Sequence, residues 1–197
     1  MKEQQKKYEL TDEFIEHWSG KKLYRIRALV AFGFVMAGQL GGFVESEKNL
    51  DQSLSGNAWV YGDAQVYGNA QVSGDAQVSG NAQVSGNAWV SGNAQVSGDA
   101  RVSGDARVYG DASVRSYAII SDKKMIFLAS NVGSENGTLT VFNGKGGLIV
   151  TRGCFTGTVD EFLSKSAKVH DDKTRNEYKL LIEVAKSRIL GVKNERN

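Results

Sequence analysis

A six-residue repeat in the middle of the chain constrains its fold more than any other feature. From Ser55 to Ile120 the sequence reads as eleven hexads, most of the form Ser-Gly-Asn/Asp-Ala-x-Val. In an extended strand the Ala and Val of a hexad lie two apart and face the same side. The Gly-Asn or Gly-Asp pair accepts the positive φ of a sharp corner. Each hexad therefore predicts a short strand followed by a corner.

The shortness of the repeat limits how successive strands can be joined. Six residues cannot hold the helical crossover that usually links parallel strands. The strands must instead wind around an axis and stack on the coil below through parallel ladders. The repeat therefore predicts a mainly β protein built as a parallel β-helix.

The pattern of Val60, Gly62 and Ala64 resembles the left-handed parallel β-helix of the hexapeptide-repeat superfamily. This resemblance implies a left-handed winding, an exception to the usual handedness of crossovers. It also implies triangular coils, each made of three hexads. Residues 55–120 would then form about 3.7 coils.

The corner residues support a coil of three hexads. Stacked carboxylates about 4.8 Å apart would repel by roughly 1 kcal/mol in water. No two corner aspartates lie three hexads apart, although some lie one or two hexads apart. The aspartates are Asp63, Asp75, Asp99, Asp105 and Asp111, and the asparagines are Asn57, Asn69, Asn81, Asn87 and Asn93.

The residues before the repeat are suited to cover one open end of the coils, where unpaired strand edges would recruit other chains. We expect residues 1–54 to form an N-terminal β cap and an irregular first coil, with a strand at Leu23–Leu29. Phe43 and Val44 match Trp59 and Val60, which predicts a four-residue insertion before Leu54. The apolar run 28–38 would be buried in this cap or, alternatively, would bind a partner.

The residues after the repeat predict a C-terminal β/α cap over 121–197 with two helices. Turn residues separate three β-prone segments, at 125–128, 139–142 and 148–151. Thr158 and Glu161 form a capping-box pair that begins the first helix. The second helix ends at Gly191. Its apolar stripe, expected in the core or in an oligomer contact, consists of Tyr178, Leu181, Ile182, Ala185 and Ile189.

The amino-acid composition indicates where in the cell the protein is expected and which classes of partner it is not expected to bind. Lys plus Arg number 24 and Asp plus Glu number 22, so the net charge of +2 gives no strong nucleic-acid signal. The longest apolar stretch is about half of what spans a bilayer, and the charged N-terminus lacks a signal peptide. One cysteine allows no intrachain disulfide. We expect a cytoplasmic protein without a membrane contact.

The known enzymes of the fold that this chain resembles are acyltransferases with a histidine general base and carbonic anhydrases with three zinc-bound histidines. This chain has only His17 and His170, and neither lies in the repeat. We therefore expect no catalytic residue, no metal and no cofactor. His170 with Asp171 and Asp172 is interpreted as a solvated turn rather than a metal site, and Cys154 as an incidental thiol.

The outward side chains offer a candidate surface for binding or oligomerisation. It consists of Trp59, Tyr61, Tyr67, Trp89, Arg101, Arg107 and Tyr109. With three hexads per coil, Trp89 and Arg107 occupy adjacent coils of one face, with Tyr109 beside them. An aromatic ring with a guanidinium is typical of contact hot spots. The fold it resembles commonly forms trimers, so we expect this surface to hold together a homo-oligomer, with a trimer favoured. Binding of a ligand or foreign partner and plain exposure remain the alternatives.

The wider layout also resembles a group of uncharacterised bacteriophage and prophage proteins. The matching segments are LYRIRAL, AGQLGGFVE, GNAWVYGDAQV and RGCFTGTVDEF. This resemblance implies a non-enzymatic phage accessory protein in the host cytoplasm, an inhibitor of host defence. It would bind an effector protein or sequester a nucleotide signal. The alternatives are a structural or assembly scaffold and an acyltransferase-like enzyme.

Overall fold

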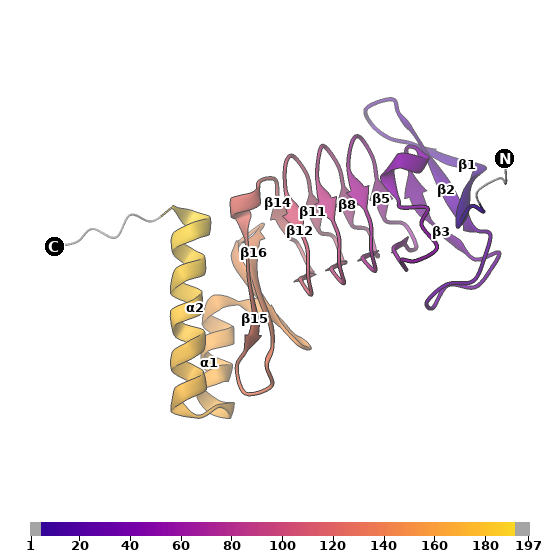
Figure 1. Ribbon diagram of the computed structural model, residues 1–197. Coiled ribbons are helices and arrows are strands. Elements are labelled where there is room, and N and C mark those ends of the chain that lie inside the picture. The colour runs from indigo at the N-terminus through magenta and orange to yellow at the C-terminus, as the bar shows by residue number, and fades with distance from the viewer. Residues whose placement is uncertain (1–4, 192–197) are drawn as a thin grey trace.

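Three ranks of very short strands form a tube at the centre of the molecule, with a cap at each end (Figure 1). The computed structural model describes residues 5–191. The first rank is β4 (Trp59–Val60), β7 (Gln77–Val78), β10 (Gln95–Val96) and β13 (Ser113–Val114). The second contains β5 (Gln65–Val66), β8 (Gln83–Val84), β11 (Arg101–Val102) and β14 (Ile119–Ile120). The third, called here the third face, is β6 (Gln71–Val72), β9 (Trp89–Val90) and β12 (Arg107–Val108).

Each strand of the regular coils pairs in parallel with the strand three hexads away, as in Gln77 with Gln95 and Val78 with Val96. The predicted coil of three hexads is therefore confirmed, and the tube is a β-solenoid of about four turns. The alanine of every hexad is buried in its interior, as are the valines of the first ten hexads and Ile120 of the last. The left-handed winding stays a prediction.

The corner asparagines and aspartates form hydrogen-bonded ladders along the outside of the tube. The amide Nδ2 of Asn81 donates to Oδ1 of Asp99 at 3.1 Å, and that of Asn93 donates to Asp111 at 2.9 Å. An amide above a carboxylate replaces repulsion by a charge-assisted hydrogen bond. This contact explains physically why no two aspartates occupy adjacent coils of one corner.

The N-terminal cap is an antiparallel sheet that continues the second rank of the solenoid. It contains β1 (Tyr8–Glu16), β2 (Lys22–Ala28) and β3 (Leu40–Val44), and β3 pairs in parallel with β5. The strand predicted at 23–29 is present as β2, whereas β1 was not predicted. Tyr8 and Phe32 pack against Trp59 and close this end of the tube.

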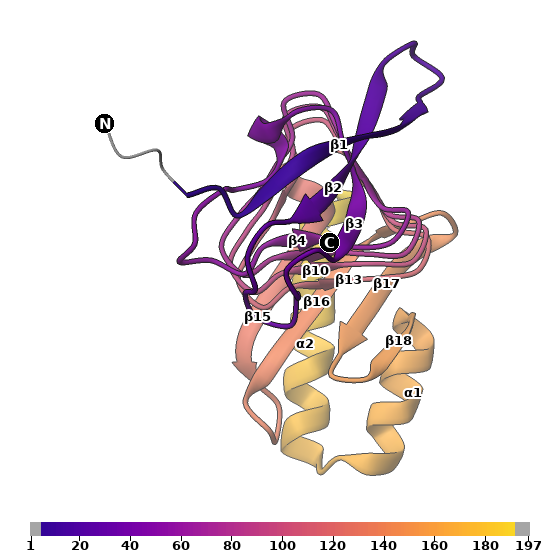
Figure 2. The ribbon, with the colours of Figure 1, turned by 90° about the vertical axis from the view of Figure 1, so that its right-hand side faces the viewer.

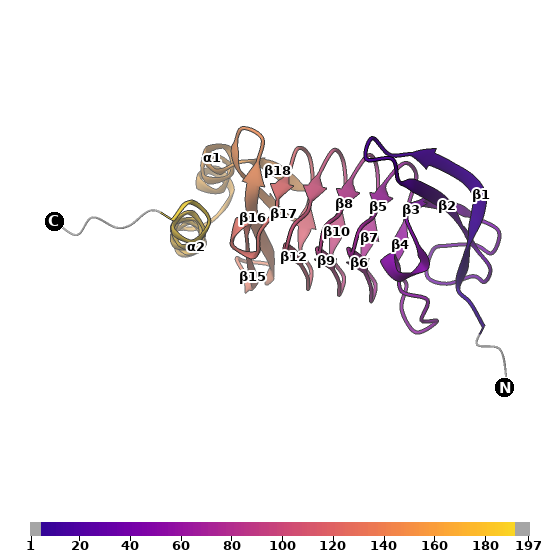
Figure 3. The ribbon, with the colours of Figure 1, turned by 90° about the horizontal axis from the view of Figure 1, so that it is seen from above.

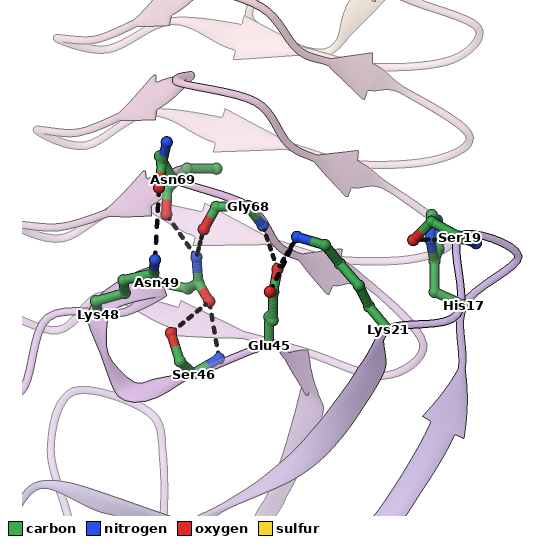
Figure 4. Close-up of polar contacts among 10 residues, drawn as sticks. His17, Ser19, Lys21, Glu45, Ser46, Lys48, Asn49, Gly68 and Asn69 are labelled. Carbon is green, nitrogen blue, oxygen red and sulfur yellow. Dashed lines mark hydrogen bonds and ion pairs between the residues drawn. The ribbon is translucent and has the colours of Figure 1, made fainter.

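The first coil is irregular, as predicted, and is closed by a side chain (Figure 4). Val44 pairs with Val66 and Leu50 pairs with Val72, whereas paired residues of the regular coils lie three hexads apart. The first coil therefore has four extra residues, and they lie between Leu50 and Trp59. Leu54, before which the insertion was expected, is 48% exposed and lies within the extra segment. The short helix η1 (Glu47–Asn49) carries the buried Asn49, whose Nδ2 donates to the carbonyls of Gly68 and Ala70.

The apolar run 28–38 is only partly buried, so the expectation that the cap buries it holds for part of the run. Phe32 and Val35 pair across the loop between β2 and β3 and face the core. Phe34 and Met36 point outward and are 92% and 70% exposed. The turn at residues 33 and 34 lies between Phe32 and Val35, so its side chains project away from the core while the two paired residues face it.

The C-terminal cap is an antiparallel sheet with two helices. The sheet contains β15 (Ile126–Val132), β16 (Gly137–Gly144), β17 (Gly147–Arg152) and β18 (Phe155–Thr158), and η2 (Lys123–Met125) precedes it. Of these strands only β18 was not predicted. The helices are α1 (Val159–Val169) and α2 (Asp172–Leu190), which lie side by side (Figure 2).

Local signals explain where the two helices begin and end. Thr158 and Glu161 form the predicted capping box, and Asp171 caps α2 by accepting from the backbone N–H of Thr174. Gly191 ends α2 with a left-handed φ of 67°. Tyr178 and Ile182, from the predicted stripe, are buried against the sheet. Within residues 5–191, no helix has the length and apolar character needed to cross a membrane.

Candidate binding groove

Trp89 and Arg107 are adjacent on the third face, as the coil of three hexads predicts. They are register partners in β9 and β12, and Cζ of Arg107 lies 5.4 Å from the centroid of the Trp89 ring. Trp89 is 47% exposed and Tyr109, which follows β12, is 56% exposed. The solenoid therefore displays an aromatic and guanidinium cluster that solvent can reach.

The C-terminal cap turns this cluster into a groove. β15 follows β12 along the same side of the molecule (Figure 3), and α2 lies beside β15. The groove has a volume of about 670 Å³. Its walls come from the solenoid (Trp89, Ser91, Arg107, Tyr109) and from the cap (Lys123, Ile126, Phe127, Leu128, Val184, Arg188).

The charges lining the groove are all positive. Arg107 comes from β12, Lys123 from η2 and Arg188 from α2, whereas no aspartate or glutamate among residues 5–191 lines the groove. Each of the three cations is therefore held by a different element. Such a surface attracts an anion, and its aromatic side chains favour a planar or apolar group.

Trp59 is not part of this groove or of any other exposed surface, which corrects the binding surface predicted from the sequence. Its side chain leaves the tube as expected, but it is fully buried beneath Tyr8 and Phe32 at ring distances of 6.1 and 5.4 Å. The repeat alone could not reveal this, because the covering residues come from the non-repeating cap.

The other predicted residues are scattered over the solenoid. Tyr61 is partly buried against the core, and this burial raises the pKa of its hydroxyl. The ring of Tyr67 lies 4.5 Å from that of His17. Arg101 lies on the second rank, in a separate hollow of about 480 Å³ with Tyr117 and Lys145. The structure thus brings together only Trp89, Arg107 and Tyr109 of the seven candidates.

The binding surface predicted from the sequence did not include the residues that the C-terminal cap contributes to the groove. Lys123 and Arg188 line the same groove as the repeat's own Arg107, yet nothing periodic connects them to it. One signal was present in the sequence. Leu180 and Val184 lie one helical turn apart and outside the core stripe of α2, and both are exposed. A second apolar strip on a helix indicates a second contact surface.

Cys154 and His170, far apart in sequence, line one cavity of about 210 Å³ in the C-terminal cap, together with Glu135. The ring of His170 lies 5.5 Å from that of Tyr178. Asp171 is occupied as the cap of α2, and the neighbouring Asp172 pairs with Arg175. Neither histidine lines the groove at Trp89.

Comparison with known families concerns the solenoid alone. The YdcK beta solenoid repeat matches residues 64–80, 76–92, 82–98, 94–110 and 100–116. These matches agree with the stacked parallel coils but cover neither cap. No curated protein matches the chain significantly. The chain thus carries a repeat similar to the YdcK beta solenoid repeat.

Proposed function

We propose that the protein is a non-enzymatic binding protein and that the groove at Trp89 and Arg107 is its binding site. The observation that carries the proposal is the arrangement of the groove itself. Two exposed aromatic rings, one of them covered by a guanidinium, lie in a groove of about 670 Å³ with three cations and, from the described part of the chain, no carboxylate. Concave sites with aromatic walls and a few convergent polar groups are typical ligand sites.

The resemblance to phage proteins suggests what such a site would do. A phage protein that captures a component of the host cell would disarm a defence that depends on that component. On this proposal the groove binds and retains its ligand, and no bond is made or broken. The resemblance is an argument by analogy and adds a biological setting to the groove.

The alternative function, an assembly scaffold, would require free strand edges at the ends of the tube, and side chains of the caps satisfy backbone groups at both ends. At the N-terminal end, Asn49 satisfies the carbonyls of Gly68 and Ala70. At the C-terminal end, Thr140 and Thr151 satisfy the backbone N–H and carbonyl of Ser113. Covered ends do not recruit another chain through free strand edges.

The proposal is tested by retention from a bacterial lysate. The wild-type protein, Trp89→Ala, Arg107→Ala and the control Arg101→Ala are immobilised, and bound proteins and small molecules are identified by mass spectrometry. We expect one component to be retained by the wild type and the control and lost from both groove variants. Equal retention by all four proteins, open-ended filaments in electron micrographs, or acyl-CoA turnover that requires His17 or His170 would contradict the proposal.

A further inference from the structure

The two walls of the groove differ in chemistry, and together they match the parts of one class of small molecule. The solenoid wall provides the exposed rings of Trp89 and Tyr109 together with the Arg107 guanidinium. The cap wall provides two cations, Lys123 and Arg188, beside apolar side chains. We infer that the ligand is a free nucleotide with several phosphates, whose base stacks at Trp89 and whose phosphates reach Lys123 and Arg188. This inference rests on the proposed binding function and specifies its ligand.

The solenoid wall is suited to a planar base. Trp89 and Tyr109 are about half exposed, and the Arg107 guanidinium lies over the Trp89 ring. The guanidinium restricts the motion of that ring and adds a second planar group for stacking. Aromatic side chains stack with any base, since every base has a π-face.

The cations of the groove, two from the cap wall and Arg107 from the solenoid wall, are suited to a multiply charged group. Among residues 5–191, Arg107, Lys123 and Arg188 form no ion pair within 4.0 Å. Three cations without such a partner repel one another, and an anion between them removes this repulsion. A single carboxylate would offset only one of the three charges. A chain of phosphates can contact several cations through charge-assisted hydrogen bonds.

The surroundings of the groove favour a free nucleotide over a nucleic-acid strand. A strand needs a continuous positive track, because each phosphate along it must be neutralised. The solenoid corners on either side of β12 instead carry Asp105 and Asp111, and the chain has a net charge of only +2. The positive charge of the groove therefore does not continue along these corners.

Isothermal titration of the full-length protein, in buffer containing EDTA, separates the two contacts. The probes are ATP, adenosine and inorganic tripolyphosphate. We expect ATP to bind more tightly than either of the other two, since only ATP contacts both walls. A short oligothymidylate, added as a fourth probe, should bind more weakly than ATP.

Two variants assign each contact to its wall. Trp89→Ala should weaken ATP binding by about fivefold or more, the value of one stacked base, while tripolyphosphate binding stays unchanged. Arg188→Ala should weaken ATP and tripolyphosphate binding and leave adenosine binding unchanged. Arg101→Ala, a solenoid arginine outside the groove, should behave as the wild type. Circular dichroism should show an unchanged fold, because all three side chains are exposed.

The inference is overturned if ATP does not bind, if adenosine or tripolyphosphate binds as tightly as ATP, or if oligothymidylate binds more tightly. It is also overturned if Trp89→Ala and Arg101→Ala bind ATP equally. In each of these cases the proposed function still stands if the lysate component is lost from the groove variants, because the groove would then hold a ligand of another class.

Discussion

In the regular coils, backbone donors of one coil reach the carbonyls of the next, as when Asn69 N donates to Gly86 O at 2.8 Å and Gln71 N to Ala88 O at 2.9 Å. In the first coil the equivalent carbonyls, of Gly68 and Ala70, accept instead from the side chain of Asn49. The regular coils are thus held together by backbone hydrogen bonds, whereas at this corner of the first coil one side chain takes the place of the backbone donors. The two regions should therefore fail under different substitutions.

The largest effect is expected where a side chain intrudes between stacked coils. Gly86 has a φ of +67°, and a Cβ there would lie 2.8 Å from the backbone N of Gly104. Gly86→Ala should lower the free energy of unfolding by about 2–5 kcal/mol, the sum of left-handed strain and overpacking. Denaturant titration would measure the loss.

Gly62 provides the matched control for this prediction. Its φ is +61°, yet a Cβ there would meet no atom within 4 Å. Gly62→Ala should therefore cost only the left-handed strain, about 1–2 kcal/mol. Equal losses for the two variants would show that coil stacking does not restrict Gly86.

The next largest effect tests the side chain that closes the first coil. Asn49→Ala leaves two carbonyls without their donor, which should cost about 2–4 kcal/mol. The exposed Asn87 side chain donates to Asp105 and accepts from Asn69, both at the surface where water can replace them, so Asn87→Ala should cost less than about 1 kcal/mol. Thermal unfolding of both variants would compare them, and a smaller loss for Asn49→Ala than for Asn87→Ala would contradict the assigned role.

A smaller effect tests the corner ladders. Asn81→Asp places a carboxylate between Asp63 and Asp99 and removes the donor to Asp99, which should cost about 1–2 kcal/mol near pH 7. The loss should diminish below about pH 4, where carboxylates are protonated. Asn69→Asp is the control, because it lies beside Asn87 and Lys48. A loss for Asn81→Asp that does not change with pH would rule out repulsion as its cause.

The smallest effect concerns Glu45, which ties the cap to the first regular coil. Burial raises the pKa of this carboxyl, but hydrogen bonds from the Gly68 N–H and the Lys21 ammonium outweigh burial and lower it below 4.5. Its stabilisation is therefore present at neutral pH and is lost as the pH falls through the folded-state pKa. Glu45→Gln should cost less than about 1 kcal/mol at pH 7 and nothing in acid. A cost that persists in acid would contradict this role.

The sequence predicted the features that follow from periodicity. The coil length placed Arg107 beside Trp89 and kept the corner aspartates apart, because a repeat fixes every position relative to its neighbours. The failures come from non-repeating segments. The burial of Trp59 depends on Phe32, and the groove depends on Lys123 and Arg188, whose positions follow from the packing of the caps. No local pattern encodes those contacts.

A crystal structure of the protein with ATP would test the central claim most directly, since the claim concerns where a ligand lies between the solenoid and its cap. We predict adenine against the Trp89 ring and phosphate oxygens within hydrogen-bond distance of Lys123 and Arg188. ATP bound at another site, with the groove left empty at saturating concentration, would contradict the account.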